Sequence, residues 1–161
     1  MICHLVPDGR HRYRLRVYYE DTDAGGVVYH ANYLRFAERA RTEALRDLGV
    51  PHAEMVREHG VMFMVRRIKL DYSQPARLDD LLTVITHPHT VGAASLGLLQ
   101  IVAREGMDSA VLVAMEVQLA CVRMADGRPA RIPARWRAAL SALAPLSALV
   151  AGQEDAPIGA Q

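Results

Sequence analysis

The stretch ANYLRFAERARTEALRDL, residues 31–48, decides the fold of this chain. Its apolar side chains recur at spacings of three and four residues, which is the period of an amphipathic helix with one buried face. That face consists of Tyr33, Ala37, Ala40, Ala44 and Leu48. Because alanines make up its middle, the helix axis can lie close to whatever packs against it. Gly49 and Pro51 then end the helix.

The segments on either side of this helix have the period of strands. Arginines alternating with apolar residues predict a strand over 12–19, and four more strands are expected over 61–72, 81–86, 96–103 and 110–122. Short helices are expected over 52–58 and 132–143. One strand, one long helix and a run of strands is an α+β order. We therefore expect an antiparallel sheet of about five strands curled around the helix.

Length and composition bound the class of protein. The 161 residues allow one domain, which we place over 12–140, with a loose leader over 1–11 and a flexible Ala/Pro-rich tail over 141–161. Apolar residues make up 51% of the chain and the net charge is +1, so neither disorder nor nucleic-acid binding is indicated. Cys3 and Cys121 cannot form a disulfide framework. No signal peptide or membrane span is predicted, and a cytoplasmic location is expected.

Alternation within the strands predicts which side chains are buried. Over 110–122 one face holds Val111, Val113, Met115, Val117, Leu119 and Cys121. Over 61–72 the apolar face holds Met62, Met64, Ile68, Leu70 and Tyr72. Arg66 falls on that same apolar side, and a buried guanidinium needs a partner. We interpret Arg66 as one half of an ion pair at a subunit interface, with a substrate contact as the alternative.

The chemistry is concentrated in residues 18–33, YYEDTDAGGVVYHANY. Three carboxylates and two adjacent glycines lie there between a strand and a helix. The first N–H groups of a helix have no partner within it and can stabilise a developing oxyanion, while glycine lets a ligand approach the backbone. A nearby carboxylate can act as nucleophile or general base. This set suits hydrolysis of an activated acyl group such as a thioester, although acidic residues and glycines before a helix also form ordinary turns and caps.

Residues 17–49, VYYEDTDAGGVVYHANYLRFAERARTEALRDLG, resemble the signature of the hotdog-fold acyl-CoA thioesterases. The likeness is to the 4-hydroxybenzoyl-CoA thioesterase-like branch, which includes the Tol–Pal-associated YbgC proteins. Residues 66–80, RRIKLDYSQPARLDD, also resemble that branch. The resemblance implies a long central helix wrapped by a curved antiparallel sheet, dimers that form a continuous sheet, further assembly into tetramers, and active sites between subunits.

The resemblance also implies roles for single residues. Asp23 matches the catalytic aspartate of the family, and His30 matches a residue that lines the same site. The backbone N–H groups of His30 and Ala31 would polarise the thioester carbonyl, while Asp23 attacks it or activates a water molecule. The choice between those two routes stays open. Substrate-binding positions implied in the same way are Gly26, Val27, Tyr29 and Arg66.

Further expectations concern substrate, cofactor and partners. We expect a short-to-medium, aliphatic rather than aromatic acyl-CoA as substrate, no cofactor and no metal. His87 and His89 would share a strand face, but a third metal ligand is not evident nearby. A homodimer or homotetramer is expected, and contact with an acyl carrier protein or with the inner-membrane surface is considered. The segment 87–95 lacks Arg and Lys, which leaves the contacts to the CoA nucleotide undetermined.

Two other functions compete with this interpretation. Asp21 and Asp23 form a DxD pair, as in some phosphatases, but that chemistry belongs to parallel α/β folds and needs a later lysine motif, whereas Lys69 is the only lysine. The other alternative is a hotdog module that binds an acyl group or an acyl carrier protein without hydrolysing it. Asp23 speaks against such a module, because loss of the catalytic carboxylate is the simplest way to make one.

Overall fold

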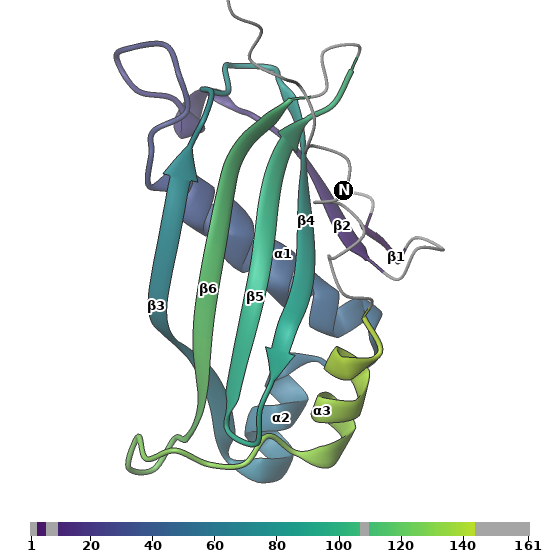
Figure 1. The fold of residues 1–161 in the computed structure, drawn as a ribbon. Helices are drawn as coiled ribbons and strands as arrows, with labels where there is room; N and C mark the ends of the chain where they lie inside the picture. The colour runs from purple at the N-terminus through teal and green to yellow at the C-terminus, as the bar shows by residue number, and fades with distance from the viewer. Residues whose placement is uncertain (1–2, 6–9, 107–109, 144–161) are drawn as a thin grey trace, which may run out of the picture.

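A computed structural model describes residues 3–5, 10–106 and 110–143 of the chain. Six strands form a single antiparallel sheet in the order β1-β2-β4-β5-β6-β3. Helix α1 runs diagonally across one face of that sheet, and α2 and α3 lie at one end of the long strands (Figure 1). The strands are β1 (Cys3–Leu5), β2 (His11–Arg16), β3 (Val61–Tyr72), β4 (Leu81–Val91), β5 (Ser95–Arg104) and β6 (Val111–Arg123). The helices are α1 (Asn32–Asp47), α2 (His52–His59) and α3 (Ala134–Ser141), with a 3-10 turn at Tyr19–Asp21.

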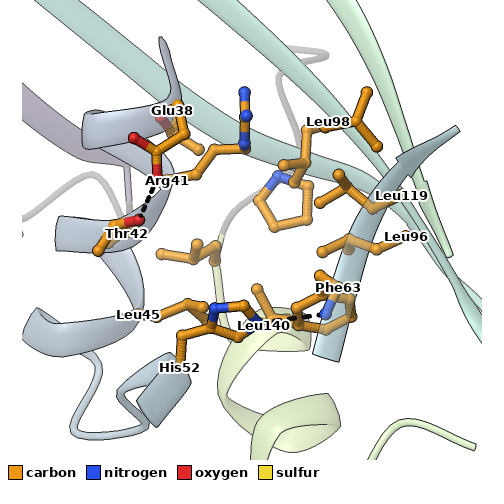
Figure 2. A pocket seen from close by; sticks show the side chains of 15 residues that line it. Glu38, Arg41, Thr42, Leu45, His52, Phe63, Leu96, Leu98, Leu119 and Leu140 are labelled. Atoms are coloured by element: carbon orange, nitrogen blue, oxygen red, sulfur yellow. Dashed lines mark hydrogen bonds between the residues drawn. The ribbon is translucent and has the colours of Figure 1, made fainter. Parts of the chain in front are cut away.

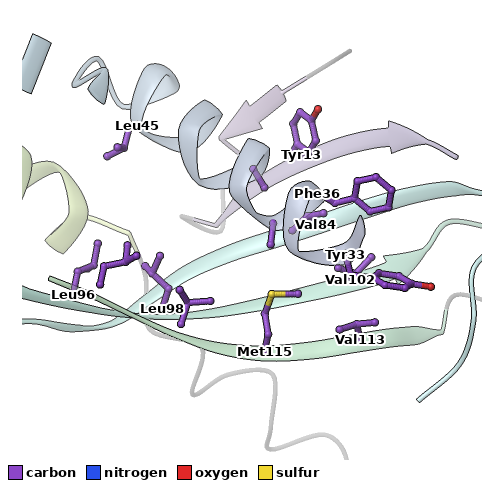
Figure 3. Packing of buried hydrophobic residues seen from close by; sticks show 14 of the residues in the cluster. Tyr13, Tyr33, Phe36, Leu45, Val84, Leu96, Leu98, Val102, Val113 and Met115 are labelled. Carbon is purple, nitrogen blue, oxygen red and sulfur yellow. The ribbon is translucent and has the colours of Figure 1, made fainter. Parts of the chain in front are cut away.

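The α+β prediction is confirmed, with the long helix packed on an antiparallel sheet. The side chains of Ala37 and Ala40 are fully buried against the sheet. Phe36, the residue before Ala37, is fully buried as well. Figure 3 shows α1 over the strands, with Phe36 and Tyr33 at one end of the layer of buried side chains and Leu45 at the other. Small residues on α1 therefore bring its backbone close to the sheet, as its alanine face indicates.

A bulge in β3 overturns the predicted alternation of that strand. Val65 pairs with Leu119 and Arg67 with Gln118, so Arg66 is the extra residue between them. Before the bulge Phe63 and Val65 pair with the buried Cys121 and Leu119 of β6, and it is Phe63, not Met62 or Met64, that packs against the core. After the bulge the predicted face of Ile68, Leu70 and Tyr72 is correct. Arg66 is exposed in the single chain, at the bulge rather than on the apolar face, and its predicted ion pair at a subunit interface stays a prediction.

Two further bulges change predicted faces in the same way. Leu112 is the extra residue opposite β5, so Val111 turns outward while the other five residues predicted to share its face stay buried. His89 is the extra residue of β4, between Pro88 and Thr90. His87 is fully buried and His89 is exposed, so the prediction that these two histidines share a strand face is wrong.

Smaller differences concern the N-terminal segment, one helix pair and the tail. Cys3–Leu5, inside the predicted loose leader, pairs with β2 as a short strand. Glu43 and Arg46 form an ion pair on the exposed side of α1. Arg41 does not pair with Glu38 on the solvent side, because its Nη1 reaches the sheet and donates to Oε1 of Gln100 at 2.9 Å. The predicted tail over 141–161 falls almost entirely outside the described residues.

None of the helices that the structure describes combines the length and the apolar composition needed to cross a bilayer.

Candidate active site

Asp23 lies in a tight turn between the 3-10 helix and α1. Thr22 and Val28 bridge the two arms of this turn, and the Asp23 N–H donates to the Val27 carbonyl at 3.0 Å. The Gly26 N–H donates back to the Asp23 carbonyl at 3.0 Å, and Gly26 has a φ of +72°, a conformation that favours glycine. Gly26 therefore allows the sharp turn, and it has no side chain that would cover the backbone there.

The Asp23 carboxylate is exposed at the surface of this turn. Its Oδ1 accepts a hydrogen bond from the Gly25 N–H at 2.8 Å, which fixes the carboxylate over the glycine pair. A Cβ on Gly25 would approach that same oxygen to 3.1 Å, so the residue is small where the carboxylate lies against the backbone. The carboxylate is therefore oriented, and its other oxygen accepts no hydrogen bond from the residues that the structure describes.

Asp21 has a structural task in the same motif. Its side chain is buried and Oδ2 accepts from the Tyr18 N–H at 2.8 Å. Its carbonyl accepts from the Tyr29 N–H and from Nδ2 of the buried Asn32, each at 2.9 Å. Asp21 thereby ties the acidic turn to the first residue of α1. Sequence reasoning missed this function of Asn32, for which its position at the end of the motif was the available signal.

The start of α1 provides the predicted N–H donors. Ala31 is the N-cap residue and supplies no side-chain cap. Within the described part of the chain, the backbone N–H groups of His30 and Ala31 have no hydrogen-bond acceptor. Such donors at a helix N-terminus favour negative charge. They are the two amides to which the family resemblance assigns polarisation of the thioester carbonyl.

Tyr72, at the end of β3, holds the His30 backbone in place. Its hydroxyl donates to the His30 carbonyl at 2.9 Å, and its ring lies edge-on to the imidazole with ring centroids 6.5 Å apart. Burial raises the pKa of Tyr72, so the phenol keeps the proton that it donates. Sequence reasoning missed this function, because Tyr72 was assigned only to an apolar strand face.

A shallow pocket of about 220 Å³ opens beside this helix start. It is lined by His30 just before α1, by Tyr33 on α1 and by Tyr72 at the end of β3. Residues 73–75 form its remaining wall. Burial also raises the pKa of Tyr33, whose hydroxyl accepts from the Ala76 N–H at 2.9 Å. Asp23 is not part of this wall. The structure thus places Asp23 and His30 at the two ends of one motif without bringing their side chains together in the single chain.

The predicted substrate-binding residues divide between two places. Gly26, Val27 and Tyr29 lie on the Asp23 turn, and the Tyr29 ring packs on that of His30 at a centroid distance of 4.4 Å. Arg66 lies elsewhere, in the wall of a separate groove of about 450 Å³ that it shares with His89.

The geometry of that groove depends on a glycine. A Cβ on Gly97 would approach the His89 ring to 2.9 Å, so only glycine lets the imidazole lie across β5. The Thr90 hydroxyl and Nδ1 of His89 are 2.8 Å apart, which orients the ring. Two groups that can carry positive charge, Arg66 and His89, thus line one groove together with Ser95 and Gln118.

Over the described ranges, no group of three or more His, Cys, Asp or Glu residues is placed to hold a metal ion.

Relatives of known sequence and structure match most of the chain. Residues 17–140 match the model of the Thioesterase-like superfamily. The acyl-CoA thioesterase YbgC of Haemophilus influenzae is 42% identical over 132 residues, which are 82% of this chain and 95% of that protein. The acyl-CoA thioesterase YbgC of Helicobacter pylori strain J99 is 37% identical over 136 residues, 81% of this chain and 99% of that protein.

Solved structures have the same architecture. A probable thioesterase from Bartonella henselae superposes with a TM-score of 0.70 at 36% identity, over 77% of this chain and 99% of that one. A 4-hydroxybenzoyl CoA thioesterase mutant complexed with 4-hydroxybenzoyl CoA superposes with a TM-score of 0.75 over 81% of this chain and 98% of that one. At 20% identity, this second likeness is one of fold.

A long helix across an antiparallel sheet, preceded by an acidic glycine-rich turn, defines a protein of the hotdog-fold class. Within that class, the chain belongs to the thioesterase-like superfamily. The predicted resemblance to hotdog-fold, YbgC-like thioesterases is therefore confirmed.

Proposed function

We propose that this chain is an acyl-CoA thioester hydrolase that releases a free acid and CoA. The observation that carries the proposal is the pairing of an exposed, oriented carboxylate on Asp23 with a helix start whose His30 and Ala31 N–H groups lack acceptors. The first group supplies a base or nucleophile, and the second stabilises negative charge on the acyl oxygen. Identity of 42% to an acyl-CoA thioesterase YbgC supports the same reaction.

Two routes are consistent with this arrangement. In one, Asp23 takes a proton from water, the hydroxide adds to the thioester carbonyl, and the C–S bond breaks as the CoA thiolate leaves and takes up the proton. In the other, an Asp23 oxygen attacks the carbonyl, expels the thiolate and forms a mixed anhydride, which water then hydrolyses. The oxygen that accepts from Gly25 is held by that bond, so the second carboxylate oxygen is the reacting atom in both routes.

The proposal includes a dimer formed through the β3 edge. β3 is an edge strand of 12 residues that exposes about half of each of the Met64, Val65 and Tyr72 side chains. A long apolar edge strand favours pairing with a second copy. Because Asp23 does not line the pocket beside His30, the complete site draws on two chains, and tetramers assemble from such dimers.

Substrate and location complete the proposal. We infer a short-to-medium aliphatic acyl-CoA, with its phosphates in the groove between Arg66 and His89. Residues 87–95 contain no Arg or Lys. In the groove, Arg66 of β3 supplies the guanidinium that this segment lacks, beside His89. Acyl carrier protein is a second possible thioester donor. A cytoplasmic location with peripheral contact to the inner membrane is part of the proposal.

The test is thiol release from a panel of acyl-CoAs of increasing chain length. Asp23→Asn should lower kcat by about 100-fold or more, the usual range for loss of a general base. Glu20→Gln, three residues away and also exposed, is the matched control and should keep wild-type turnover. His30→Ala should cost less than Asp23→Asn, because the backbone N–H survives the substitution.

Other outcomes would contradict the proposal. Full turnover by a folded Asp23→Asn variant would remove Asp23 from the chemistry. Binding of acyl-CoA by the wild type without thiol release would instead indicate a non-catalytic acyl-binding module.

A further inference from the structure

A second cavity lies inside the chain, beneath the C-terminal half of α1. It has a volume of about 160 Å³ and is walled by α1, the sheet and α3. Figure 2 shows Leu45, Leu140 and Phe63 on one side and Leu96, Leu98 and Leu119 on the other, all directed at one space. The six leucines in these walls, which include Leu143, are each less than 9% exposed.

This cavity is separate from the Asp23 and His30 motif. None of the residues predicted to act on the substrate lines it. Glu38, the first residue of α1 in its lining, follows Asn32 by six positions, which is about 9 Å along a helix. The cavity is therefore a second space within the chain, with no role in the proposed reaction as described above.

Its polar end is formed by Arg41, at the top of Figure 2. Nη1 of Arg41 donates to Oε1 of Gln100, a neutral acceptor whose own amide group donates to the Ala37 carbonyl and to the Thr86 hydroxyl. Within the residues that the structure covers, no carboxylate lies within 4.0 Å of the Arg41 guanidinium, although burial lowers its pKa. Arg41 is half-buried, and a guanidinium has five N–H donors that an anionic partner stabilises when solvent is partly excluded.

Among the other polar groups at this end, the charge of Glu38 partly opposes the lowering of the Arg41 pKa, but Glu38 makes no ion pair with the guanidinium in the described structure. Glu38 is exposed at the rim, and its Oε1 accepts from the Thr42 hydroxyl at 2.9 Å. Its charge is therefore screened by solvent more strongly than that of Arg41. Nε2 of His52 accepts from the Phe63 N–H at 3.1 Å, and burial lowers the pKa of His52, so this imidazole is neutral near pH 7.

We propose that this cavity binds a short aliphatic monocarboxylate, with its chain among the leucines and its carboxylate on Arg41. The size follows from the volume, because an apolar protein cavity of about 150 Å³ holds one benzene molecule, or about six carbons. The leucine walls select an aliphatic chain, and the guanidinium selects an oxyanion over a neutral head group. Asp23 is not part of this site, so the proposed binding and the proposed hydrolysis can be tested independently of each other.

The experiment measures binding of hexanoate to the full chain by calorimetry, beside acetate, decanoate and hexanol. Hexanoate should bind most tightly, and hexanol should bind at least about tenfold more weakly, since it lacks the charge that pairs with Arg41. Absence of binding tighter than about 10 mM would overturn the proposal. Equal affinity for hexanol would overturn the role of Arg41.

Variants locate the site. Arg41→Gln, which removes the charge, and Leu45→Phe, which fills the space, should each weaken hexanoate binding at least about tenfold. Arg46→Gln, one turn further on the exposed side of α1, is the matched control and should bind as the wild type does. Asp23→Asn should also bind normally. Loss of binding in Asp23→Asn with retention in Leu45→Phe would place the acid at the active site instead.

A measurement on the unmodified protein covers the case in which a cavity variant does not fold. Hexanoate should shift the leucine methyl resonances of Leu45, Leu98 and Leu140 in an NMR spectrum, and leave the methyl groups of Val28 beside His30 unchanged. The reverse pattern would overturn the proposal.

Discussion

The two ends of α1 differ in what they offer to a ligand. At the N-terminal end, backbone N–H groups and an acidic turn meet a shallow pocket that His30, Tyr33 and Tyr72 line. At the C-terminal end, leucines and a half-buried arginine line a space between α1, the sheet and α3. One end is built for chemistry on a polar group, and the other for holding a hydrocarbon chain.

The alanine face explains why both can exist on one helix. Ala37 and Ala40 bring the middle of α1 against the sheet, so the layer is closed there. Toward Leu45 the space between helix and sheet is shared with α3, and the side chains that meet there do not fill it. A helix that touches the sheet at its centre thus separates two compartments.

The largest expected effect is on stability, when one buried side chain is truncated at each end of α1. Phe36 is fully buried in the closed part of the layer, whereas Leu45 already borders a cavity. Phe36→Ala should lower the free energy of unfolding by about 4 kcal/mol, and Leu45→Ala by about 2 kcal/mol, because truncation costs most where the surrounding atoms are closely packed. Chemical denaturation at a fixed protein concentration measures both. Equal losses would mean that the two ends are packed alike.

Asn32→Ala tests how the acidic turn is fastened to α1. The substitution removes the hydrogen bond from Nδ2 to the Asp21 carbonyl and should cost about 1–2 kcal/mol of stability. Turnover should fall as well, because the Asp23 turn loses its link to the helix start. Arg35→Ala, on the exposed side of the same turn of α1, is the control for thermal unfolding and thiol release. Unchanged turnover in a destabilised Asn32→Ala variant would show that this hydrogen bond stabilises the fold without contributing to catalysis.

Tyr72→Phe should have a smaller effect, confined to the N-terminal end. It removes one hydrogen bond to the His30 carbonyl, which is worth about 1 kcal/mol, so kcat/KM should fall less than about tenfold. The ring and its edge contact to His30 remain, and the melting temperature should hardly change. A loss as large as that of Asp23→Asn would instead give the phenol a direct part in the reaction.

The smallest effect concerns pH at the cavity end. Burial lowers the pKa of His52 and Glu38 opposes the shift. The unfolded chain therefore takes up a proton on this residue near pH 6.5, whereas the folded chain does so only at lower pH. Stability should decline as the pH falls below about 6.5, and His52→Gln, which keeps an acceptor for the Phe63 N–H, should decline less. Urea titrations between pH 7 and pH 5 measure the difference, with His59→Gln on the same helix as control.

Local patterns predicted the parts of the molecule that local chemistry determines. The helix over 31–48, its alanine face and the acidic glycine turn follow from periodicity and residue type, and the structure has them within a residue or two. The three bulges, at Arg66, His89 and Leu112, were not predicted, since each depends on how one strand meets its neighbour. The internal cavity was missed for a related reason. Leucines on four separate elements line it, and no spacing within one segment brings them together.

The roles of Asp23 and His30 came from resemblance rather than from spacing. Spacing places them seven residues apart in one motif, but it does not predict which side chains share a pocket. Tyr72 and Asn32, which hold that motif in place, reach it from another strand and from inside the helix. Their hydrogen bonds are to main-chain atoms, so neither leaves a recognisable pair of side chains in the sequence.

The bulge at Arg66 has a consequence for how this fold can change. On its N-terminal side odd-numbered residues of β3 face the interior, and on its C-terminal side even-numbered ones do. The single extra residue therefore determines which side chains face the interior in the two halves of β3, the half that borders the cavity and the half that reaches His30. Replacing Arg66 leaves that phase intact, whereas deleting it would turn one half of the strand inside out. Along this edge, the number of residues constrains the protein more strongly than their identity.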